Sequence, residues 1–318
     1  MTATPTMVAL VEEYLALRRQ LGFALHSSGQ QLLGFARFAD GIDHRGPITV
    51  DLAVRWARLP EGARPSWWAR RLQIVRGFAQ HRSLFDPGTE IAPAGLLGPL
   101  FRRLTPHIYS ETEITALLRA AAELGPQGGL RPHTYVTLLG LLLSAGLRIS
   151  EALHLGRDDV DLHGGVLTVR RTKFKKSRLV PLHPSTVVAL AAYARRRDQH
   201  SRAAAPGTFF VNELGTALSA SGVARSFSAL RDKLGWTKNQ EGRRPRLHDM
   251  RHTMAVRTLL RWVKEGAEVD RKMPALATYL GHVEVSDTYW YLTAVPELMA
   301  LTAARFEAYR RRDVGRVR

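Results

Sequence analysis

Apolar residues recur at helical spacing through most of the chain. In residues 7–40 they fall three and four positions apart, which is typical of helices with one buried face. The polar run 26–29 divides this stretch into two predicted helices. A third helix is expected after Thr49, whose hydroxyl can cap it, and a fourth after Pro65. Residues 1–85 are therefore predicted to form a helical domain.

Helix-breaking residues crowd the stretch that follows. Residues 86–106 contain four prolines and three glycines, a density that is typical of an interdomain linker. A second domain, residues 107–318, is predicted to begin with a helix after Ser110. Ser110 and Glu113 have the spacing of a capping box, in which each side chain bonds the backbone N–H of the other residue.

The second domain is predicted to be helical apart from one β region. Residues 134–145 predict a buried helix that ends at Gly146. β-Branched residues around a turn at 164–165 predict short strands within residues 160–169 and 178–182. The predicted fold class is therefore mainly α with a small antiparallel β-sheet. Further helices are expected over residues 150–155, 185–197, 221–234, 247–263 and 296–312, the last of them amphipathic.

The charge balance changes this picture from a generic helical protein to one with a polyanionic partner. The chain has 46 Lys and Arg against 28 Asp and Glu, a net charge of +18. The part up to residue 105 carries +5 and the rest +13, so the basic character is concentrated in the second domain. Nucleic acid is the partner that such an excess most often indicates.

Other parts of the composition exclude some classes of protein. The chain has no cysteine, which excludes disulfides and cysteine-ligated zinc. The longest apolar run, Val136–Leu143, is too short to cross a bilayer. Residues 1–6 lack the charged start and apolar core of a secretion signal. We therefore expect a cytoplasmic protein, and the charge suggests association with the nucleoid.

One stretch in the last quarter gathers polar groups that suit an anion. His248 and Arg251 are three positions apart, so they share one face of the predicted helix, and both can donate hydrogen bonds to phosphate oxygens. The same stretch places His248 and His252 four positions apart, as in zinc hydrolases. Arg251 would oppose a metal ion there, and no third ligand follows at a characteristic spacing. Taken alone, the pair is more often a solvated helix face; the functional interpretation is an anion site, with a zinc hydrolase as the alternative.

An arginine with a nearby carboxylate follows the predicted buried helix. Arg148 lies two residues after Gly146, and Glu151 is three residues further on, where its carboxylate can hold the planar guanidinium in place. Such support suits an arginine that grips a phosphate, because loose positioning lowers catalytic rates. The alternative is an ordinary arginine that complements the dipole of a helix end.

Two further groups of residues have both a simple and a catalytic interpretation. Lys173, Lys175, Lys176 and Arg178 form a basic hairpin tip, which suits a DNA-backbone contact or a solvated turn. A lysine on such a hairpin can also deliver a proton to a leaving alkoxide as a general acid. Tyrosines such as Tyr291, taken singly, are more often core aromatics than nucleophiles.

Taken together, these segments resemble the tyrosine recombinase (phage integrase) family, and they occur in the family's order. Gly146–Glu151 resembles its first box, residues 172–182 its catalytic β-hairpin, and His248–Arg251 its His-x-x-Arg box. Leu280–His282, followed nine residues later by a tyrosine, resembles its closing box and selects Tyr291 over Tyr289. The resemblance implies the catalytic residues Arg148, Lys173, His248, Arg251, His282 and Tyr291, with Glu151 in support.

The resemblance also implies an activity and an architecture. The activity is that of a site-specific recombinase, a DNA strand transferase that works through a 3′-phosphotyrosine intermediate without metal, ATP or cofactor. The architecture is a two-domain clamp on double-stranded DNA, with residues 1–85 as a SAM-like core-binding domain and residues 107–318 as the catalytic domain. DNA contacts are expected from Lys175, Lys176, Arg178, Arg70 and Arg71.

A homotetramer on DNA is implied, with the C-terminal helix as an interaction helix and accessory proteins as further partners. Integration, excision or resolution of a mobile element, including transposition, is the expected role. Three related alternatives share parts of the pattern: a type IB topoisomerase, a telomere-resolving strand transferase, and a non-catalytic DNA-binding relative. The presence of all six site residues disfavours the last of these.

Overall fold

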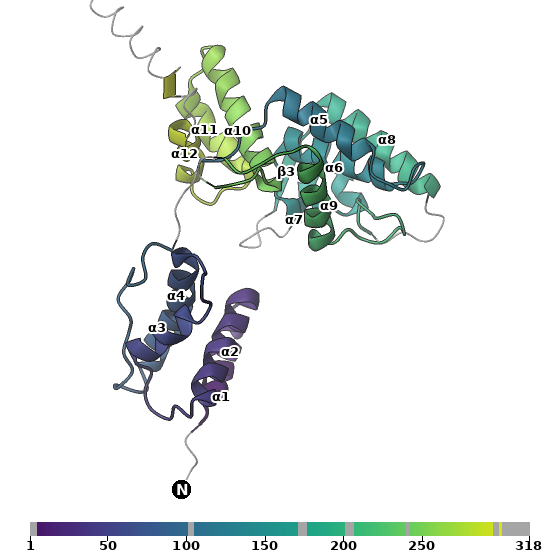
Figure 1. Cartoon of the computed structure of the whole chain (residues 1–318). Helices are drawn as coiled ribbons and strands as arrows, with labels where there is room; N and C mark the ends of the chain where they lie inside the picture. Colours follow the sequence, from purple (N-terminus) through teal and green to yellow (C-terminus); the bar gives the residue numbers. More distant parts are fainter. Residues whose placement is uncertain are drawn as a thin grey trace, which may run out of the picture. The chain divides into compact units, whose positions relative to one another are not determined.

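The computed structural model describes residues 5–100, 105–170, 177–200, 207–239, 242–294 and 299–300. The chain forms two compact units, Met1–Arg103 and Leu104–Arg318 (Figure 1). The fold is mainly helical with one small antiparallel sheet, as predicted. No helix among the described residues has both the length and the apolar character needed to cross a membrane.

Within residues 5–100, the regular secondary structure of the first unit is helical. Thr6 and Thr49 begin their helices by accepting hydrogen bonds from Ala9 N and Leu52 N, which satisfies otherwise unpaired backbone donors. A core lies between the helices, with Phe35 and Phe78 fully buried. The four helices of the described part are α1 (Met7–Gln20), α2 (His26–Gly41), α3 (Val50–Arg58) and α4 (Pro65–Arg82).

The predicted linker differs from expectation in its first part, which packs on the first unit. Ala92 is buried, and its carbonyl oxygen accepts a hydrogen bond from Arg76 Nε at 2.9 Å. Glu90 accepts from Val50 N at 2.7 Å and donates its own backbone N–H to Ile48 O. The prolines and glycines therefore shape an ordered loop over α3 and α4, because the loop finds apolar and hydrogen-bonding partners there.

The second unit begins with the predicted capping box. Glu113 N donates to Ser110 Oγ at 3.1 Å, and Ser110 N donates to Glu113 Oε2 at 2.8 Å. The helices of its described part are α5 (Glu111–Ala122), α6 (Arg131–Ala145), α7 (Ile149–Leu153), the short 3-10 helix η1 (Arg157–Asp159), α8 (Pro184–His200), α9 (Ala220–Lys233), α10 (Leu247–Lys264), α11 (Val269–Leu280) and α12 (Ser286–Ala294).

Three short strands form the antiparallel sheet in the order β1-β2-β3. They are β1 (Val160–Asp161), β2 (Val166–Val169) and β3 (Arg178–Pro181), and the predicted turn at 164–165 joins the first two. Leu167 lies opposite Val160 on one side and Val180 on the other. All three are buried, so this row of side chains fixes the register of the sheet against the core.

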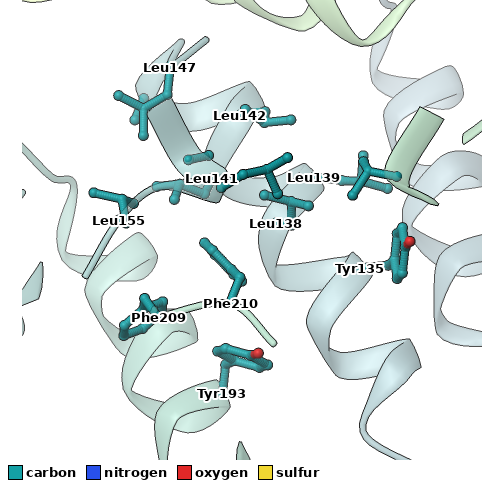
Figure 2. Packing of buried hydrophobic residues seen from close by; sticks show 14 of the residues in the cluster. Tyr135, Leu138, Leu139, Leu141, Leu142, Leu147, Leu155, Tyr193, Phe209 and Phe210 are labelled. Atoms are coloured by element: carbon teal, nitrogen blue, oxygen red, sulfur yellow. The ribbon is translucent and has the colours of Figure 1, made fainter. Parts of the chain in front are cut away.

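Helix α6 runs through the centre of the second unit, because it is apolar on nearly every side. Leu138, Leu139, Leu141 and Leu142 are at most 1% exposed, and Figure 2 shows them in one layer near Tyr193 and Phe210. Burying one leucine stabilises the fold by about 1.5–3 kcal/mol. The central helix is thus a rigid support for the residues that follow its C-terminal end, where Arg148 stands.

Candidate active site

Residues far apart in the sequence meet around the ends of α6 and α11. Helix α6 ends at Gly146, and α11 ends at Gly281; both glycines have positive φ, +61° and +70°. The backbone can turn sharply at these positions because glycine tolerates the left-handed conformation. The backbone carbonyls at the two turns have no partner within their helices, and they accept hydrogen bonds from the arginines of the site.

Arg251 is the most deeply buried of these arginines. It lies in the second turn of α10 and is only 2% exposed. Its Nη1 donates to Gly146 O at 2.8 Å and its Nη2 to Leu280 O at 2.5 Å. Burial, followed by the charge of Arg148, lowers the pKa of Arg251 to about 10, so the group stays positive at neutral pH. Carbonyls at helix C-termini suit this charge because they form the negative end of the helix dipole.

Arg148 stands before α7 and keeps part of its guanidinium at the surface. Nη1 donates to Glu151 Oε1 at 2.8 Å, and Nη2 donates to Gly281 O at 2.9 Å. Its backbone N–H also donates to Glu151 Oε2 at 2.9 Å, so one carboxylate holds both parts of the residue. The side chain is 30% exposed. The group is therefore fixed in direction and still open to an anionic ligand.

Arg178 lies mostly inside the unit, with its side chain 10% exposed, and its guanidinium bonds protein groups. Both of its terminal nitrogens donate to the Glu151 carboxylate, at 3.0 and 2.9 Å, and its Nε donates to Tyr279 O at 2.8 Å. Burial alone would raise the pKa of Glu151, but hydrogen bonds and charges from Arg178 and Arg148 lower it to about 2. Arg178 thus links β3 to α7 and α11.

Three imidazoles surround the two arginines. His248 lies at the edge of the cluster, exposed to solvent on one side and packed against His252 on the other. The two rings meet edge to face, with their centroids 4.7 Å apart. Nδ1 of His282 is 2.7 Å from the hydroxyl of Thr288, a fully buried residue. Desolvation is the first cause that lowers the pKa of each ring, to about 4 for His248 and His282 and about 3 for His252. All three rings are therefore neutral at neutral pH and can exchange hydrogen bonds without adding charge.

Tyr291 completes the cluster from α12. It is 2% exposed, and its hydroxyl oxygen lies 3.0 Å from Nδ1 of His252. Burial raises the pKa of its phenol, whereas Arg251 and Arg148 act in the lowering direction. Tyr289 is 39% exposed and donates to Asp270 Oδ1 at 3.2 Å. Of the two tyrosines, only Tyr291 thus contacts the cluster of arginines and histidines.

Some predicted residues are not part of this cluster. Lys173, Lys175 and Lys176 lie outside the described residues. Arg70 is exposed on α4 in the first unit. Arg71 has partners within the first unit: its guanidinium lies 3.7 Å from the centroid of the Trp56 ring and donates to Trp56 O at 2.8 Å, so it joins α4 to α3. The DNA contacts of Arg70 and Arg71 stay predictions.

His252 is a member of the cluster that the catalytic assignment from sequence did not include. The sequence signal for His252 is its four-residue spacing from His248, but this spacing is typical of a pair of metal ligands. The described residues contain no group of three or more His, Cys, Asp or Glu side chains placed to hold a metal ion. The arrangement instead offers two fixed guanidiniums, neutral imidazoles and a phenol, which suits an anion with a reactive centre, such as a phosphodiester.

Comparisons with known proteins agree on one family. A sequence profile of the phage integrase family matches residues 108–297. The chain is 46% identical over 301 residues to y4rB of Sinorhizobium fredii, an integrase/recombinase by name, covering 93% of this chain and 96% of that protein.

Solved structures show the same fold. The Tn1549 transposon integrase in complex with transposon right end DNA has a TM-score of 0.67 at 17% identity, covering 96% of this chain and 99% of that one. A lambda integrase tetramer bound to a Holliday junction has a TM-score of 0.59 at 15% identity, covering 88% and 78% of the two chains.

Proposed function

The chain belongs to the phage integrase family, the tyrosine recombinases, and from this premise we propose that it is a site-specific recombinase with Tyr291 as its nucleophile. Members of the family are DNA strand transferases. The observation that carries the assignment of the nucleophile is the position of its hydroxyl: it lies in a cluster with Arg251 and His252, within the same turn region that anchors Arg148.

The proposed reaction follows from the charges in this cluster. A phenol that is protonated at neutral pH is a weak nucleophile, so the site must stabilise the negative charge that develops on the phosphate. Arg148 and Arg251 would bind the two nonbridging oxygens, since both guanidiniums are positive and fixed. His248 and His282 would donate hydrogen bonds to the same oxygens, which can only accept them.

The bonds balance in one displacement step. The Tyr291 oxygen attacks phosphorus and gives its proton to solvent water, the bond from phosphorus to the 5′-oxygen breaks, and the leaving oxygen takes up a proton. Lys173 is the proposed donor of that proton, by its position in the family motif. The product is a 3′-phosphotyrosine with a free 5′-hydroxyl, which preserves the energy of the phosphodiester for rejoining to a partner strand.

The proposed substrate is double-stranded DNA, and the proposed assembly is four copies on two DNA sites. The net charge of +18 supports a polyanionic partner. Neighbours with the same fold are bound to DNA, and one of them is a tetramer on a Holliday junction. Movement of a mobile element, in the cytoplasm at the nucleoid, is the role we propose.

A covalent adduct tests the nucleophile. The chain is incubated with a duplex that carries the inverted repeats flanking its own gene and a nick near the cleavage position, so that the cut strand cannot be rejoined. We expect an adduct in denaturing gels from the natural chain and from Tyr289→Phe, and none from Tyr291→Phe. Arg148→Ala and Arg251→Ala should each slow adduct formation by about a hundredfold or more.

The adduct should also form in the presence of a metal chelator, because no step needs a metal ion. An adduct from Tyr291→Phe with none from Tyr289→Phe would refute the assignment of the nucleophile. Loss of the adduct on chelation would refute the proposed mechanism as a whole.

A further inference from the structure

The structure brings His252 against the atom that we assign as the nucleophile. Its Nδ1 lies 3.0 Å from the hydroxyl oxygen of Tyr291, and the two residues come from different helices, α10 and α12. The proposed reaction gives His252 no role, although it lies next to Arg251 in the sequence.

The ring of His252 is fixed by other rings around it. His248 meets it edge to face at 4.7 Å, Trp290 at 5.9 Å and Tyr291 itself at 5.5 Å. Both histidines belong to the same helix, one turn apart, so the backbone fixes their spacing. Nδ1 therefore has a defined position relative to the Tyr291 oxygen, and the contact does not rest on one rotatable side chain at a surface.

The protonation states give the hydrogen bond its direction. Desolvation is the first cause that lowers the pKa of His252, to about 3, and the charges of Arg246 and Arg251 act in the same direction, so the ring is neutral at neutral pH. The phenol of Tyr291 is also neutral there, since burial raises its pKa. The neutral phenol can donate its hydrogen to Nδ1, 3.0 Å from its oxygen, and this direction requires the ring proton of His252 to be on Nε2.

We propose that His252 is a positioning residue for the nucleophile, which accepts the hydrogen of the Tyr291 hydroxyl and so sets the place and rotation of the phenol oxygen. With its hydrogen directed at His252, the oxygen keeps a lone pair for attack on phosphorus and stays beside Arg251. The inference rests on the proposed function, because it concerns the tyrosine assigned there as nucleophile. It gives His252 an effect on the rate of adduct formation and none on DNA affinity.

Two substitutions separate this role from simple packing. His252→Asn keeps an acceptor, because the asparagine Oδ1 lies close to the position of Nδ1, but removes the aromatic ring. His252→Phe keeps an aromatic ring among its neighbours but removes the acceptor. A packing role predicts that the phenylalanine variant behaves like the natural chain and the asparagine variant does not. The positioning role predicts the reverse.

The measurements are single-turnover adduct formation on the nicked duplex at saturating protein, and DNA affinity by fluorescence anisotropy. We expect His252→Phe to form the adduct about a hundredfold more slowly, with unchanged affinity, because small errors in placement have effects of that size. His252→Asn should retain a rate within about tenfold of the natural chain. His183→Asn and His183→Phe are the controls, since His183 Nδ1 also lies near a hydroxyl, that of Ser185 at 2.8 Å, outside the cluster.

A second measurement needs neither catalysis nor the His252 variants, so it tests the contact even if those variants do not fold. The ¹⁵N shifts of the histidine rings report which nitrogen carries the proton and whether the other accepts a hydrogen bond. In the natural full-length chain we expect His252 as the Nε2–H form with a hydrogen-bonded Nδ1, and we expect that signature to change in Tyr291→Phe. His183 should keep its shifts in the same variant.

Several results would overturn the proposal. They are a His252→Phe variant that forms the adduct as fast as the natural chain or faster, a His252→Asn variant that is slower than His252→Phe, or His252 shifts that do not respond to Tyr291→Phe. Failure of the proposed function has a different signature: the natural chain would then form no adduct at all, whatever residue stands at position 252, while the ring shifts would still decide whether the contact exists.

Discussion

Three guanidinium groups and one carboxylate stand together where α7, β3 and α11 meet. Glu151 binds Arg148 and Arg178 directly, and Arg251 is held next to them by backbone carbonyls. Three positive charges against one negative leave the cluster with an excess that a phosphate would neutralise. Glu151 thus holds Arg148 and Arg178 together but cancels only one of the three positive charges.

Glu151→Gln tests how much this arrangement depends on the carboxylate. The amide has nearly the same shape but no charge, so the mostly buried Arg178 and the partly exposed Arg148 would lose their counter-ion. Removing one partner from a buried ion pair destabilises a fold by about 3–5 kcal/mol. We therefore expect a loss of about 3 kcal/mol in the free energy of unfolding at pH 7, measured by urea denaturation. Glu123→Gln, which breaks the exposed pair with Lys233, should change it little.

The stability difference between the natural chain and Glu151→Gln should depend on pH in a defined direction. The pKa of Glu151 is about 2 in the fold and 4.5 ordinarily, so its stabilising contribution is complete above about pH 4.5. That contribution is lost as the pH falls toward 2, because the unfolded chain takes up the proton first. The difference in stability between the natural chain and Glu151→Gln should thus be constant above pH 4.5 and shrink below it. A difference that stays constant down to pH 2.5 would contradict the lowered pKa.

At the residue scale, sequence motifs were informative about which residues gather but not about what each one contacts. The spacing of Arg148 and Glu151 predicted their pairing, and the pairing is present. Arg178 follows a run of lysines, which suggested a solvated surface, whereas β3 carries it inward to Glu151. The contact of His252 with Tyr291 joins α10 to α12. It depends on how these two helices pack against each other, which a local sequence pattern does not specify.

The ends of two helices act as ligands for the arginines of the site. The last carbonyls of an α-helix have no partner within the helix and carry its negative dipole end. Gly146 O binds Arg251, and the pair Leu280 O and Gly281 O binds Arg251 and Arg148. The two glycines that end α6 and α11 thus hold both guanidiniums at the same turn region.

Gly281→Ala tests this use of a helix end. An added Cβ would lie 2.8 Å from Arg178 Nη1 and 3.0 Å from its Cζ, so that guanidinium would have to move away from Glu151. The φ of +70° adds a cost of about 1–2 kcal/mol for a residue with a side chain. We expect a loss of unfolding free energy larger than that cost, together with slower adduct formation.

Gly235→Ala is the matched control for this substitution. Gly235 has a φ of +69°, and a Cβ there would meet nothing within 4 Å. The control should therefore show the backbone cost alone, with an unchanged rate of adduct formation. Equal losses of stability and equal rates in the two variants would show that the contact with Arg178 has no influence on the site.

At the scale of helices and strands, the sequence predicts those helix ends that are marked by a capping residue or a glycine. The capping box at Ser110 and the end of the buried helix at Gly146 are where the sequence placed them. The short helix predicted over residues 150–155 is instead Ile149–Leu153, because the Glu151 side chain bonds the backbone N–H of Arg148 and starts the helix earlier. The predicted C-terminal helix 296–312 lies outside the described residues, apart from 299–300 in its first turn.

Each of the two compact units has its own hydrophobic core, and the positive charge is distributed over both. Trp56 and Phe78 belong to the core of the first unit, and Leu138 and Phe210 to that of the second. The density of prolines and glycines in the sequence indicates a boundary between two parts of the chain, but it does not predict the ordered packing of residues 86–92 on the first unit. That packing depends on apolar partners on α3 and α4, which a count of prolines and glycines does not register.

Binding of the whole molecule to DNA should be governed by release of counter-ions from phosphates. We expect the logarithm of the association constant to fall linearly with the logarithm of salt concentration, with a slope of about −0.9 for each phosphate neutralised. Arg70 and Arg71 allow a test of whether one part of the first unit contributes to this salt dependence. Both line a groove of about 370 Å³ beside α2 and α4, and the polar residues Ser27 and Gln31 line the same groove.

The two arginines should respond differently because their surroundings differ. Arg70 is exposed, so Arg70→Ala should leave the thermal stability unchanged and reduce the size of the salt slope by about 1, measured by anisotropy with duplex DNA. Arg71 stacks on Trp56 and bonds its carbonyl, so Arg71→Ala should lower the melting temperature. A salt slope that is unchanged in Arg70→Ala would mean that Arg70 neutralises no phosphate of the bound DNA.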